Sequence, residues 1–298
     1  MYKLPFVSLL AVTAACSAQR RDKPATTGGN SMSAASQPKS GATFASSKDG
    51  TRIAFAKSGR GPALVIVGGA LSQRQGGEPL ARQLREHFTV YTYDRRGRGE
   101  SGDTKPYSVG REIEDLHAVI EQCGERAHVY GVSSGAALAL RATEELGPAS
   151  VRKLAVYEPP YGQGEHAFNE QKERVNQLVR SGEPGQAAEY FLSAVGMPAA
   201  ALDTMKRSPE WPAIQKIDFT LAYDYLVLGN GAVPNEVKNV RVPTLVMNGE
   251  KSLSFMGPTT QRLAELIPSA ERKVLPGQTH QAAPEVVAPL LIQFFGQG

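Results

Sequence analysis

Residues 127–140 read Ala-His-Val-Tyr-Gly-Val-Ser-Ser-Gly-Ala-Ala-Leu-Ala-Leu and decide the fold. The apolar run Ala127 to Tyr130 predicts a buried strand, and the small residues after the turn predict a helix packed closely against it. Between them, Gly131 and Gly135 lack a Cβ, so strand and helix can approach while Ser133 takes a strained backbone and projects its hydroxyl outward. A Gly-x-Ser-x-Gly pattern alone arises by chance in about one chain in five of this composition, so the flanking strand and helix carry the prediction. Ser133 is therefore the candidate nucleophile.

Short apolar runs alternate with helical patterns on both sides of this segment. The pair Asp49-Gly50 between two such runs indicates a hairpin. The repeated strand–helix units that follow predict an α/β fold with a doubly wound, mostly parallel sheet. The expected strands are residues 42–46, 52–56, 63–67, 89–93, 127–130, 153–157, 243–247 and 272–275, and the expected helices include residues 77–87, 113–120, 136–146, 259–266 and 284–295.

A long insertion separates the sixth and seventh expected strands. It runs from about residue 161 to residue 240 and repeats helical spacings, such as Val175 with Leu178 and Ala187 with Tyr190. This length is too great for a loop, and open α/β sheets bind ligands at the carboxyl edge of their strands. We therefore expect residues 161–240 to form a helical cap over that edge, and residues 42–160 and 241–298 to form the core.

A second motif, Asp94-Arg-Arg-Gly-Arg-Gly-Glu-Ser-Gly102, follows the fourth expected strand and resembles the D-x-R-G-x-G-x-S turn of α/β-hydrolases. With the Ser133 turn, it makes the chain similar to that superfamily over about residues 42–296. The resemblance implies a serine hydrolase whose site residues follow the chain order nucleophile, acid, histidine. Residues 93–94, 133–136, 157–160 and 277–280 resemble a bacterial subgroup of hydrolases that implies no particular substrate.

Five histidines are candidates for the base that accepts the serine proton. His280 follows the last expected strand in Leu-Pro-Gly-Gln-Thr-His, where the resemblance places the catalytic histidine. His87 lies at a helix end, His117 beside the apolar stripe of a helix, and His128 in or beside a strand, so we expect each to be structural or solvated. His166 lies in the cap and is expected to be an ordinary surface residue. His280 is therefore the candidate base.

The candidate acid departs from the usual family pattern. Many members place an Asp after the seventh strand in a Gly-Glu-x-Asp segment, whereas residues 249–252 read Gly-Glu-Lys-Ser. Other members take the carboxylate from the end of the sixth strand, where this chain has Glu158. We expect Glu158 to accept the Nδ1 proton of His280 and to fix its tautomer. The alternatives are Glu250 in this role, or Glu158 as an acceptor for backbone groups.

A developing oxyanion needs two backbone N–H donors. One is expected from Ser134, the residue after the nucleophile. The other is expected from the loop Gly68-Gly69-Ala70 after the third strand. The family resemblance implies Ala70, with Gly68 standing where a histidine is usual, and Gly69 is the alternative donor.

These residues predict a serine hydrolase that cleaves an acyl bond of a small hydrophobic substrate, with a carboxylic ester expected, through an acyl-enzyme on Ser133. The chemistry requires no metal or organic cofactor, and Ser133 excludes the aspartate-nucleophile enzymes of this fold. Two alternatives remain. The missing Asp at position 252 allows an inactive hydrolase fold retained as a binding protein. A thioester or carbon–carbon bond hydrolase would use the same residues.

The N-terminus predicts export. Lys3 precedes an apolar stretch of about 12 residues that ends in small residues, as in a signal peptide at residues 1–16, and this stretch is too short to span a bilayer. Cys16 resembles the lipid-attachment cysteine of bacterial lipoproteins, and residues 17–41 resemble a flexible tether. We expect a membrane-anchored lipoprotein facing the periplasm or the cell surface, with a periplasmic or secreted protein as the alternative.

Composition limits the class of partner. The 298 residues, 41% hydrophobic and 21% charged, fit one large α/β domain or at most two domains. The net charge of +4 lies within residues 1–41, which leaves the remaining chain neutral. A neutral body lacks the basic patch of a nucleic-acid-binding protein, so we exclude that partner. If Cys16 is lipidated or removed, Cys123 stands alone and no intramolecular disulfide can form.

Overall fold

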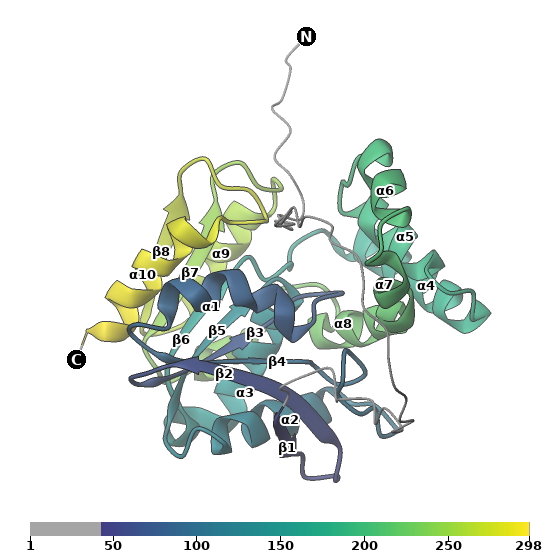
Figure 1. Ribbon diagram of the computed structural model, residues 1–298. Helices are drawn as coiled ribbons and strands as arrows, with labels where there is room; N and C mark the ends of the chain where they lie inside the picture. Colours follow the sequence, from purple (N-terminus) through teal and green to yellow (C-terminus); the bar gives the residue numbers. More distant parts are fainter. Residues whose placement is uncertain (1–42, 298) are drawn as a thin grey trace, which may run out of the picture. The chain divides into compact units, whose positions relative to one another are not determined.

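Eight strands form one mostly parallel sheet in the computed structural model, which describes residues 43–297 (Figure 1). The strand order is β1-β2-β4-β3-β5-β6-β7-β8. β1 and β2 form the expected antiparallel hairpin, β2 also runs antiparallel to β4, and all other neighbours are parallel. The α/β prediction is confirmed. The strands are β1 (Thr43–Ser46), β2 (Arg52–Gly59), β3 (Ala63–Val67), β4 (Thr89–Tyr93), β5 (Ala127–Val132), β6 (Val151–Tyr157), β7 (Thr244–Gly249) and β8 (Ala270–Leu275).

The residue content of each strand matches its place in the sheet. β3 lies between β4 and β5 and is a continuous apolar run, all five residues of which are buried. β8 lies at the edge and exposes Glu271 and Arg272. Charged side chains on an edge strand discourage pairing with another chain, because they would have to be desolvated.

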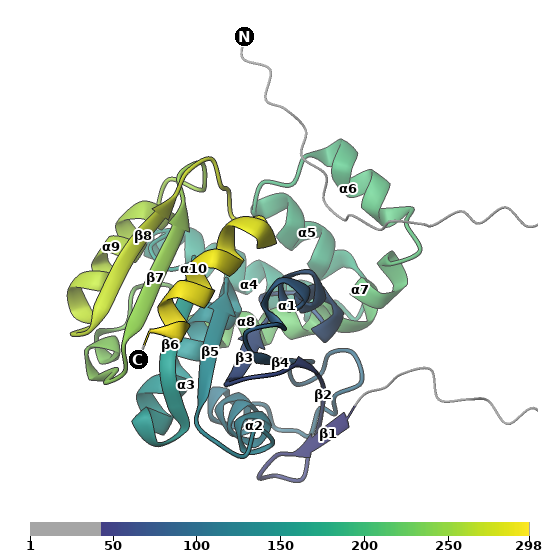
Figure 2. The same ribbon diagram turned by 60° about the vertical axis from the view of Figure 1, so that its left-hand side comes forward.

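Helices cover both faces of the sheet (Figure 2). One face packs against α1 (Glu78–Leu84) and α10 (Pro284–Gly296), whose side chains share one apolar cluster. The other face packs against α2 (Val109–Glu121), α3 (Ser134–Ser150) and α9 (Met256–Leu266). The connection from β3 thus crosses one face and the connection from β5 crosses the other, so the carboxyl ends of these neighbouring strands form the topological switch point of the sheet. Open α/β sheets place ligands at such a point.

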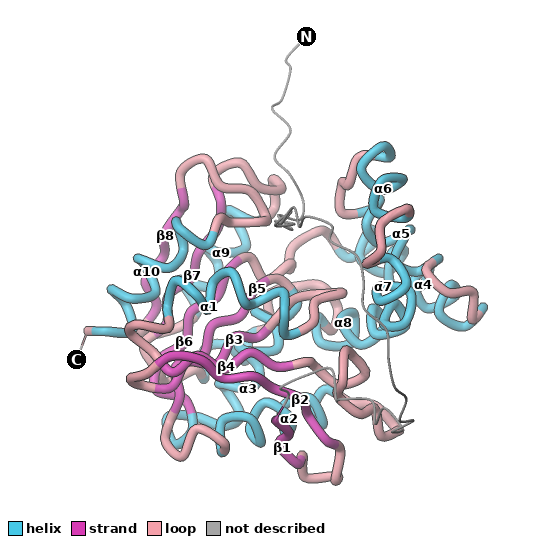
Figure 3. Tube along the Cα trace, in the orientation of Figure 1, coloured by secondary structure: helices cyan, strands magenta, loops and turns pink. Residues whose placement is uncertain are grey.

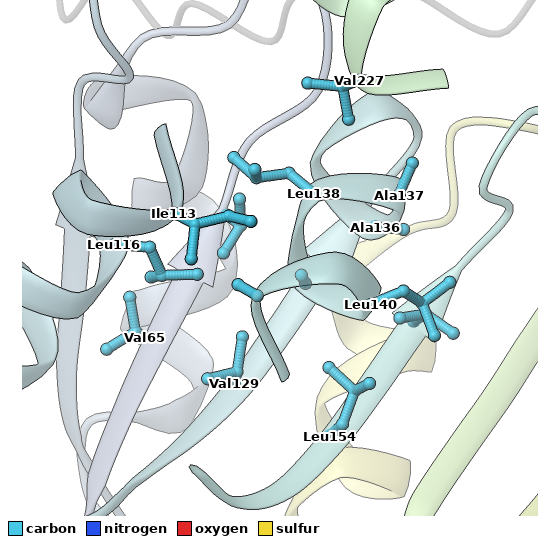
Figure 4. Close-up of a cluster of buried hydrophobic side chains, with 14 of the residues drawn as sticks. Val65, Ile113, Leu116, Val129, Ala136, Ala137, Leu138, Leu140, Leu154 and Val227 are labelled. Carbon is cyan, nitrogen blue, oxygen red and sulfur yellow. The ribbon is translucent and has the colours of Figure 1, made fainter. Parts of the chain in front are cut away.

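The larger core cluster lies beneath α2 and α3 (Figure 4). Leu116 of α2 and Leu138 of α3 are fully buried, as are Val65 and Val129 of the strands beneath them. Ala136 and Ala137 are also fully buried, and their small side chains let α3 lie close to the sheet. Val227 of the cap joins the same cluster, so the core and part of the cap share one apolar interior.

The insertion between β6 and β7 is helical, as the sequence predicts (Figure 3). α8 contacts α3 and α4, which brings this part of the cap against the core. A separate small cluster of Ala188, Leu202 and Trp211 holds α5, α6 and α7 together, and Leu71 of the core packs against it. The elements are α4 (Glu165–Ser181), α5 (Gln186–Ala194), α6 (Ala199–Lys206), α7 (Trp211–Ile217), α8 (Leu221–Leu228) and the 3-10 turns η2 (Asp218–Thr220) and η3 (Asn235–Asn239).

Several element boundaries differ from the sequence-based expectation. The helix expected at residues 77–87 is shorter: a 3-10 turn, η1 (Arg74–Gly77), precedes α1, and the helix ends at Leu84. α3 begins two residues earlier than expected and continues past a break at Gly147, whose φ is 62°. The predicted signal peptide (residues 1–16), the tether (17–41) and Cys16 lie outside the described residues. No helix within residues 43–297 has the length and apolarity required to cross a bilayer.

His128 is buried inside β5, on the face covered by α10. Its ring lies 4.6 Å from that of Phe295 and 6.0 Å from that of Phe88, and its exposed fraction is 2%. Burial, with Arg152 and Lys153 nearby, lowers the pKa of His128 from 6.5 to about 4. The imidazole therefore stays neutral in the native state at pH values at which it is protonated in the unfolded chain.

We expect His128 to make the protein acid-sensitive. Between pH 6.5 and about pH 4 the unfolded state binds one more proton than the native state, so stability falls as pH falls through this window. The expected loss from this residue is about 2 kcal/mol between pH 7 and pH 5. Urea unfolding of wild type and His128→Phe at several pH values measures it. An equal pH dependence in the two proteins would contradict the assignment.

Candidate active site

Ser133, Glu158 and His280 come from three different strand ends but meet at the carboxyl edge of the sheet. Ser133 follows β5, Glu158 follows β6, and His280 lies in the loop between β8 and α10. Parallel neighbours end on the same side of a sheet, so residues distant in sequence converge there. The site lies beside the switch point formed by β3 and β5.

The turn between β5 and α3 holds Ser133 in a strained conformation. Its φ is 56° and its ψ is −129°, values that a residue with a side chain rarely adopts. A Cβ at Gly131 would lie 2.6 Å from the carbonyl oxygen of Gly135, so only glycine allows the strand and helix to come this close. The Ser133 N–H donates to the Tyr157 carbonyl at 2.9 Å, which ties the turn to β6. The local structure matches the strand–turn–helix expected from the sequence.

A chain of hydrogen bonds joins the three side chains. Ser133 Oγ lies 3.1 Å from His280 Nε2, and His280 Nδ1 lies 2.6 Å from Glu158 Oε2. With a proton on Nδ1, the imidazole donates to the carboxylate and presents the Nε2 lone pair to the serine hydroxyl. The arrangement can therefore move a proton from Ser133 to His280 and place the resulting positive charge beside a carboxylate.

Glu158, the first candidate acid, is fully buried and fully hydrogen-bonded. Its Oε1 accepts the Gly249 N–H at 2.7 Å, and its Oε2 accepts the Ser252 hydroxyl at 2.7 Å. Its backbone φ is 49°, a strained value for a residue with a side chain. The alternative acid, Glu250, is exposed and accepts the Gly277 N–H at 2.8 Å. The structure thus brings Glu158 to His280 and leaves Glu250 bonded elsewhere.

The loop that carries His280 is fixed at two points. The Tyr157 hydroxyl donates to the Thr279 carbonyl, and the Lys251 N–H donates to the Gln278 carbonyl at 2.8 Å. Both contacts come from the ends of neighbouring strands, β6 and β7. They position the imidazole, whose side chain is 34% exposed, so that one edge is open to a substrate.

The predicted oxyanion donors lie beside Ser133. Ser134 is the first residue of α3, where a backbone N–H has no acceptor within the helix. A Cβ at Gly69 would lie 2.9 Å from the Ser133 Cβ and 3.5 Å from its Oγ, so this loop passes directly against the serine. Ala70 follows Gly69, and Leu71 then has a φ of 56°. Both segments that the sequence singled out therefore lie next to Ser133.

Sequence reasoning missed a buried ion cluster behind these donors. Arg95 and Arg98 both bond the carboxylate of Asp224, which belongs to the cap helix α8. Burial alone would raise the pKa of Asp224, but Arg98 and Arg95 together hold it below its usual range. The Ser134 hydroxyl also donates to Asp224. Asp224 lies 126 positions from Arg98, so no local pattern indicates the pair.

A cavity of about 250 Å³ opens beside His280, on the face covered by α1 and α10. Apolar side chains form much of its wall, among them Leu80, Val132 and Val287. Arg74 also borders it, paired with Asp94 and Glu100. Gly68 and His280 both line the cavity, and its lining residues belong to the core rather than to the cap.

Comparison with known proteins places the chain in a family of enzymes. The Alpha/beta hydrolase family model matches residues 64–290, and the chain therefore belongs to the α/β hydrolase family. An α/β hydrolase from Sphaerobacter thermophilus is 44% identical and superposes with a TM-score of 0.78 over 85% of this chain and all of that one. A hydrolase from Pseudomonas aeruginosa, 19% identical, shares the fold with a TM-score of 0.71 over 87% of this chain and all of that one.

One curated sequence relative carries a stated activity. N-formylmaleamate deformylase from Pseudomonas putida is 33% identical over 113 residues, which is 37% of this chain and 42% of the relative. A Bacillus subtilis hydrolase is 32% identical over 95 residues, or 30% of this chain and 35% of the relative. The chain thus matches less than half the length of these curated relatives.

The acid assignment predicts different outcomes for Glu158→Gln and Glu250→Gln. A glutamine at 158 cannot hold the imidazolium, so the rate of fluorophosphonate labelling of Ser133 should fall at least about 1,000-fold. Glu250→Gln, the matched control, should label at the wild-type rate. Thermal melts check that both variants are folded. If Glu158→Gln is labelled at the wild-type rate, Glu158 is not the acid of the site.

Proposed function

We propose that the protein is a serine hydrolase that cleaves an acyl bond, a carboxylic ester in the first instance, of a small hydrophobic substrate through an acyl-enzyme on Ser133. The observation that carries the proposal is the hydrogen-bonded chain from Ser133 through His280 to Glu158, with separations of 3.1 and 2.6 Å. A nucleophile, a base and an orienting carboxylate within hydrogen-bonding reach are the requirements of this chemistry.

In the first half-reaction His280 Nε2 takes the Ser133 proton while Oγ attacks the carbonyl carbon and the carbonyl electron pair moves to oxygen. Glu158 stabilises the imidazolium. The intermediate then expels the alcohol, which receives the proton from Nε2, and the acyl group stays on Ser133. In the second half-reaction His280 deprotonates a water molecule, which attacks the acyl carbon and releases the acid, so that Ser133 recovers its proton.

The backbone N–H groups of Ala70 and Ser134 stabilise the negative oxygen in both intermediates. Each such donor contributes about 3 kcal/mol in the transition state. The donors act without reorganisation because one belongs to a helix terminus and the other to a loop packed against Ser133. No metal is required for this stabilisation.

The cavity beside His280 supports a small apolar substrate group. Its volume of about 250 Å³ is less than that of sites for drug-sized ligands, which begin at about 300 Å³. Burying one methylene group there is worth about 0.8 kcal/mol, so a short chain can be selected by size. We assign the acyl chain of the substrate to this cavity.

A formyl amide, a second type of acyl bond, is supported by a separate observation. The similarity to N-formylmaleamate deformylase over 113 residues favours a formyl amide as the alternative substrate. A thioester or carbon–carbon bond would use the same three residues, and an inactive binding protein would retain the fold without turnover. Assays on each bond type separate these alternatives.

The proposed function predicts fluorophosphonate labelling and hydrolysis of p-nitrophenyl esters by wild type. Ser133→Ala should lose labelling completely and lower ester turnover by at least about 10⁴-fold, because the nucleophile is gone. Ser193→Ala, on the exposed surface of α5, is the matched control and should behave as wild type. A folded wild type that neither labels nor turns over any acyl substrate would favour a binding protein.

The cavity assignment predicts a change in chain-length preference. In Ala282→Phe a larger side chain enters the cavity, so kcat/KM for octanoate esters should fall at least about tenfold while acetate changes less than about threefold. Ala283→Phe, one residue further and outside the cavity wall, should keep the wild-type preference. An equal loss for both ester lengths in Ala282→Phe would place the acyl chain elsewhere.

A further inference from the structure

The peptide group between Gly69 and Ala70 is held by a buried cation. Arg98 Nη1 donates to the Gly69 carbonyl at 2.6 Å, and the Arg98 residue is 1% exposed. In a planar trans peptide the C=O and N–H bonds point in opposite directions. Fixing the Gly69 carbonyl toward Arg98 therefore fixes the Ala70 N–H on the opposite side. The Gly69 N–H belongs to the preceding peptide group, whose carbonyl lies at the longer distance of 3.4 Å from Arg95 Nη1.

The other nitrogen of the guanidinium is held by the cap. Arg98 Nη2 lies 2.9 and 2.8 Å from the two carboxylate oxygens of Asp224. The Ser134 hydroxyl donates to the same carboxylate at 2.8 Å. One cap side chain thus connects the two segments that supply the oxyanion donors, the loop after β3 and the first residue of α3.

Arg95 completes the cluster. Its Nη1 lies 2.8 Å from Asp224, 3.2 Å from the Ser134 hydroxyl and 3.4 Å from the Gly68 carbonyl. Glu112 balances its charge through two hydrogen bonds of 2.8 Å each. Two cations and two carboxylates are therefore buried together. Such a cluster tolerates the loss of one member poorly, because the remaining charges stay uncompensated.

The loop needs this support. Leu71, directly after Ala70, has a φ of 56°, a strained conformation that persists only where neighbours enforce it. Arg98 bonds the Gly69 carbonyl, two residues before Leu71, from inside the core. The positively charged guanidinium also polarises this peptide group, which strengthens the Ala70 N–H as a donor.

Resting on the proposed hydrolase function, we propose that Arg98, oriented by Asp224 of the cap, is a positioning residue that aims the Ala70 N–H at the oxyanion. In the D-x-R-G-x-G-x-S turn Arg98 occupies an unspecified position, so the motif does not assign it this role. The cap then contributes to the chemical step as well as covering the site.

The test compares Arg98→Met with wild type on the preferred ester. Active-site titration with a fluorophosphonate first counts competent sites, so that misfolded protein does not enter the rates. Per site, kcat should fall about 100-fold with KM changed less than about threefold, since an interaction made only in the transition state is lost. The inhibition constant of a trifluoromethyl ketone, whose adduct with Ser133 bears an oxyanion, should rise by the same factor.

Arg96→Met is the matched control. Arg96 lies in the same turn, is fully buried and pairs with Asp115 at 2.8 and 2.6 Å, but its hydrogen bonds go to residues 49, 51, 104 and 115 rather than to the oxyanion segments. We expect it to lower the melting temperature while its kcat per site and its ketone inhibition constant stay within about twofold of wild type. This control separates positioning from stability.

Arg98→Lys provides a second test if too few active sites of Arg98→Met react with the fluorophosphonate for its rates to be measured. Lysine retains the charge but not the planar fork, so its kcat and inhibition constant should lie between those of wild type and the expected methionine values. Per-site constants within twofold of wild type in every measurable Arg98 variant would overturn the proposal and leave the hydrolase function intact. If the wild-type protein shows neither labelling nor turnover, the proposed hydrolase function is wrong, and the role of Arg98, which rests on that function, is wrong as well.

Discussion

The close packing of α3 on the end of β3 is the constraint on which the site depends. A Cβ at Gly135 would lie 2.4 Å from the carbonyl oxygens of both Val67 and Gly68, so the first turn of the helix fits there only with glycine. Because α3 begins at Ser134 and the loop begins at Gly68, this contact sets how far Ser133 lies from the loop after β3. Backbone packing therefore determines the spacing of the two segments of the candidate site.

The candidate acid, Glu158, is hydrogen-bonded by the residue that departs from the usual family pattern. Position 252, where the usual family pattern has an Asp, carries a serine whose hydroxyl donates to Glu158 at 2.7 Å. A buried carboxylate is costly unless its oxygens are hydrogen-bonded, and here the Gly249 N–H and the Ser252 hydroxyl bond it while His280 Nδ1 lies 2.6 Å away. The end of β7 thus provides donors for a carboxylate that comes from the end of β6. The serine at position 252 is thus in direct contact with the candidate acid.

The sequence predicts the elements that depend on local patterns and misses those that depend on long-range pairing. Continuous apolar runs and the Gly-x-Ser-x-Gly turn predict β3, β5 and α3, and family position predicts His280. The boundary errors at α1 and α3 arise because helix ends depend on packing as well as composition. From the sequence, the candidate acid could be narrowed only to Glu158 or Glu250. The backbone conformation of Glu158, with a φ of 49°, is set by its surroundings in the fold and leaves no local pattern. Asp224 had no local signal at all, because its partners lie in a different part of the chain.

Backbone strain explains why the cap and the core depend on each other. Within residues 43–297 the non-glycine residues with positive φ are Leu71, Ser133 and Glu158, and each follows a central strand at the candidate site. Each conformation costs about 1–3 kcal/mol, so each needs an external restraint. The sheet restrains two of them: the Ser133 N–H bonds the Tyr157 carbonyl, and the Glu158 N–H bonds the Met247 carbonyl at 3.0 Å. Leu71 packs against both the main core cluster and the small cap cluster, and the nearby Gly69–Ala70 peptide is bonded by Arg98, which pairs with Asp224. The loop after β3 is therefore restrained by the core and the cap together, whereas Ser133 and Glu158 are restrained by the sheet.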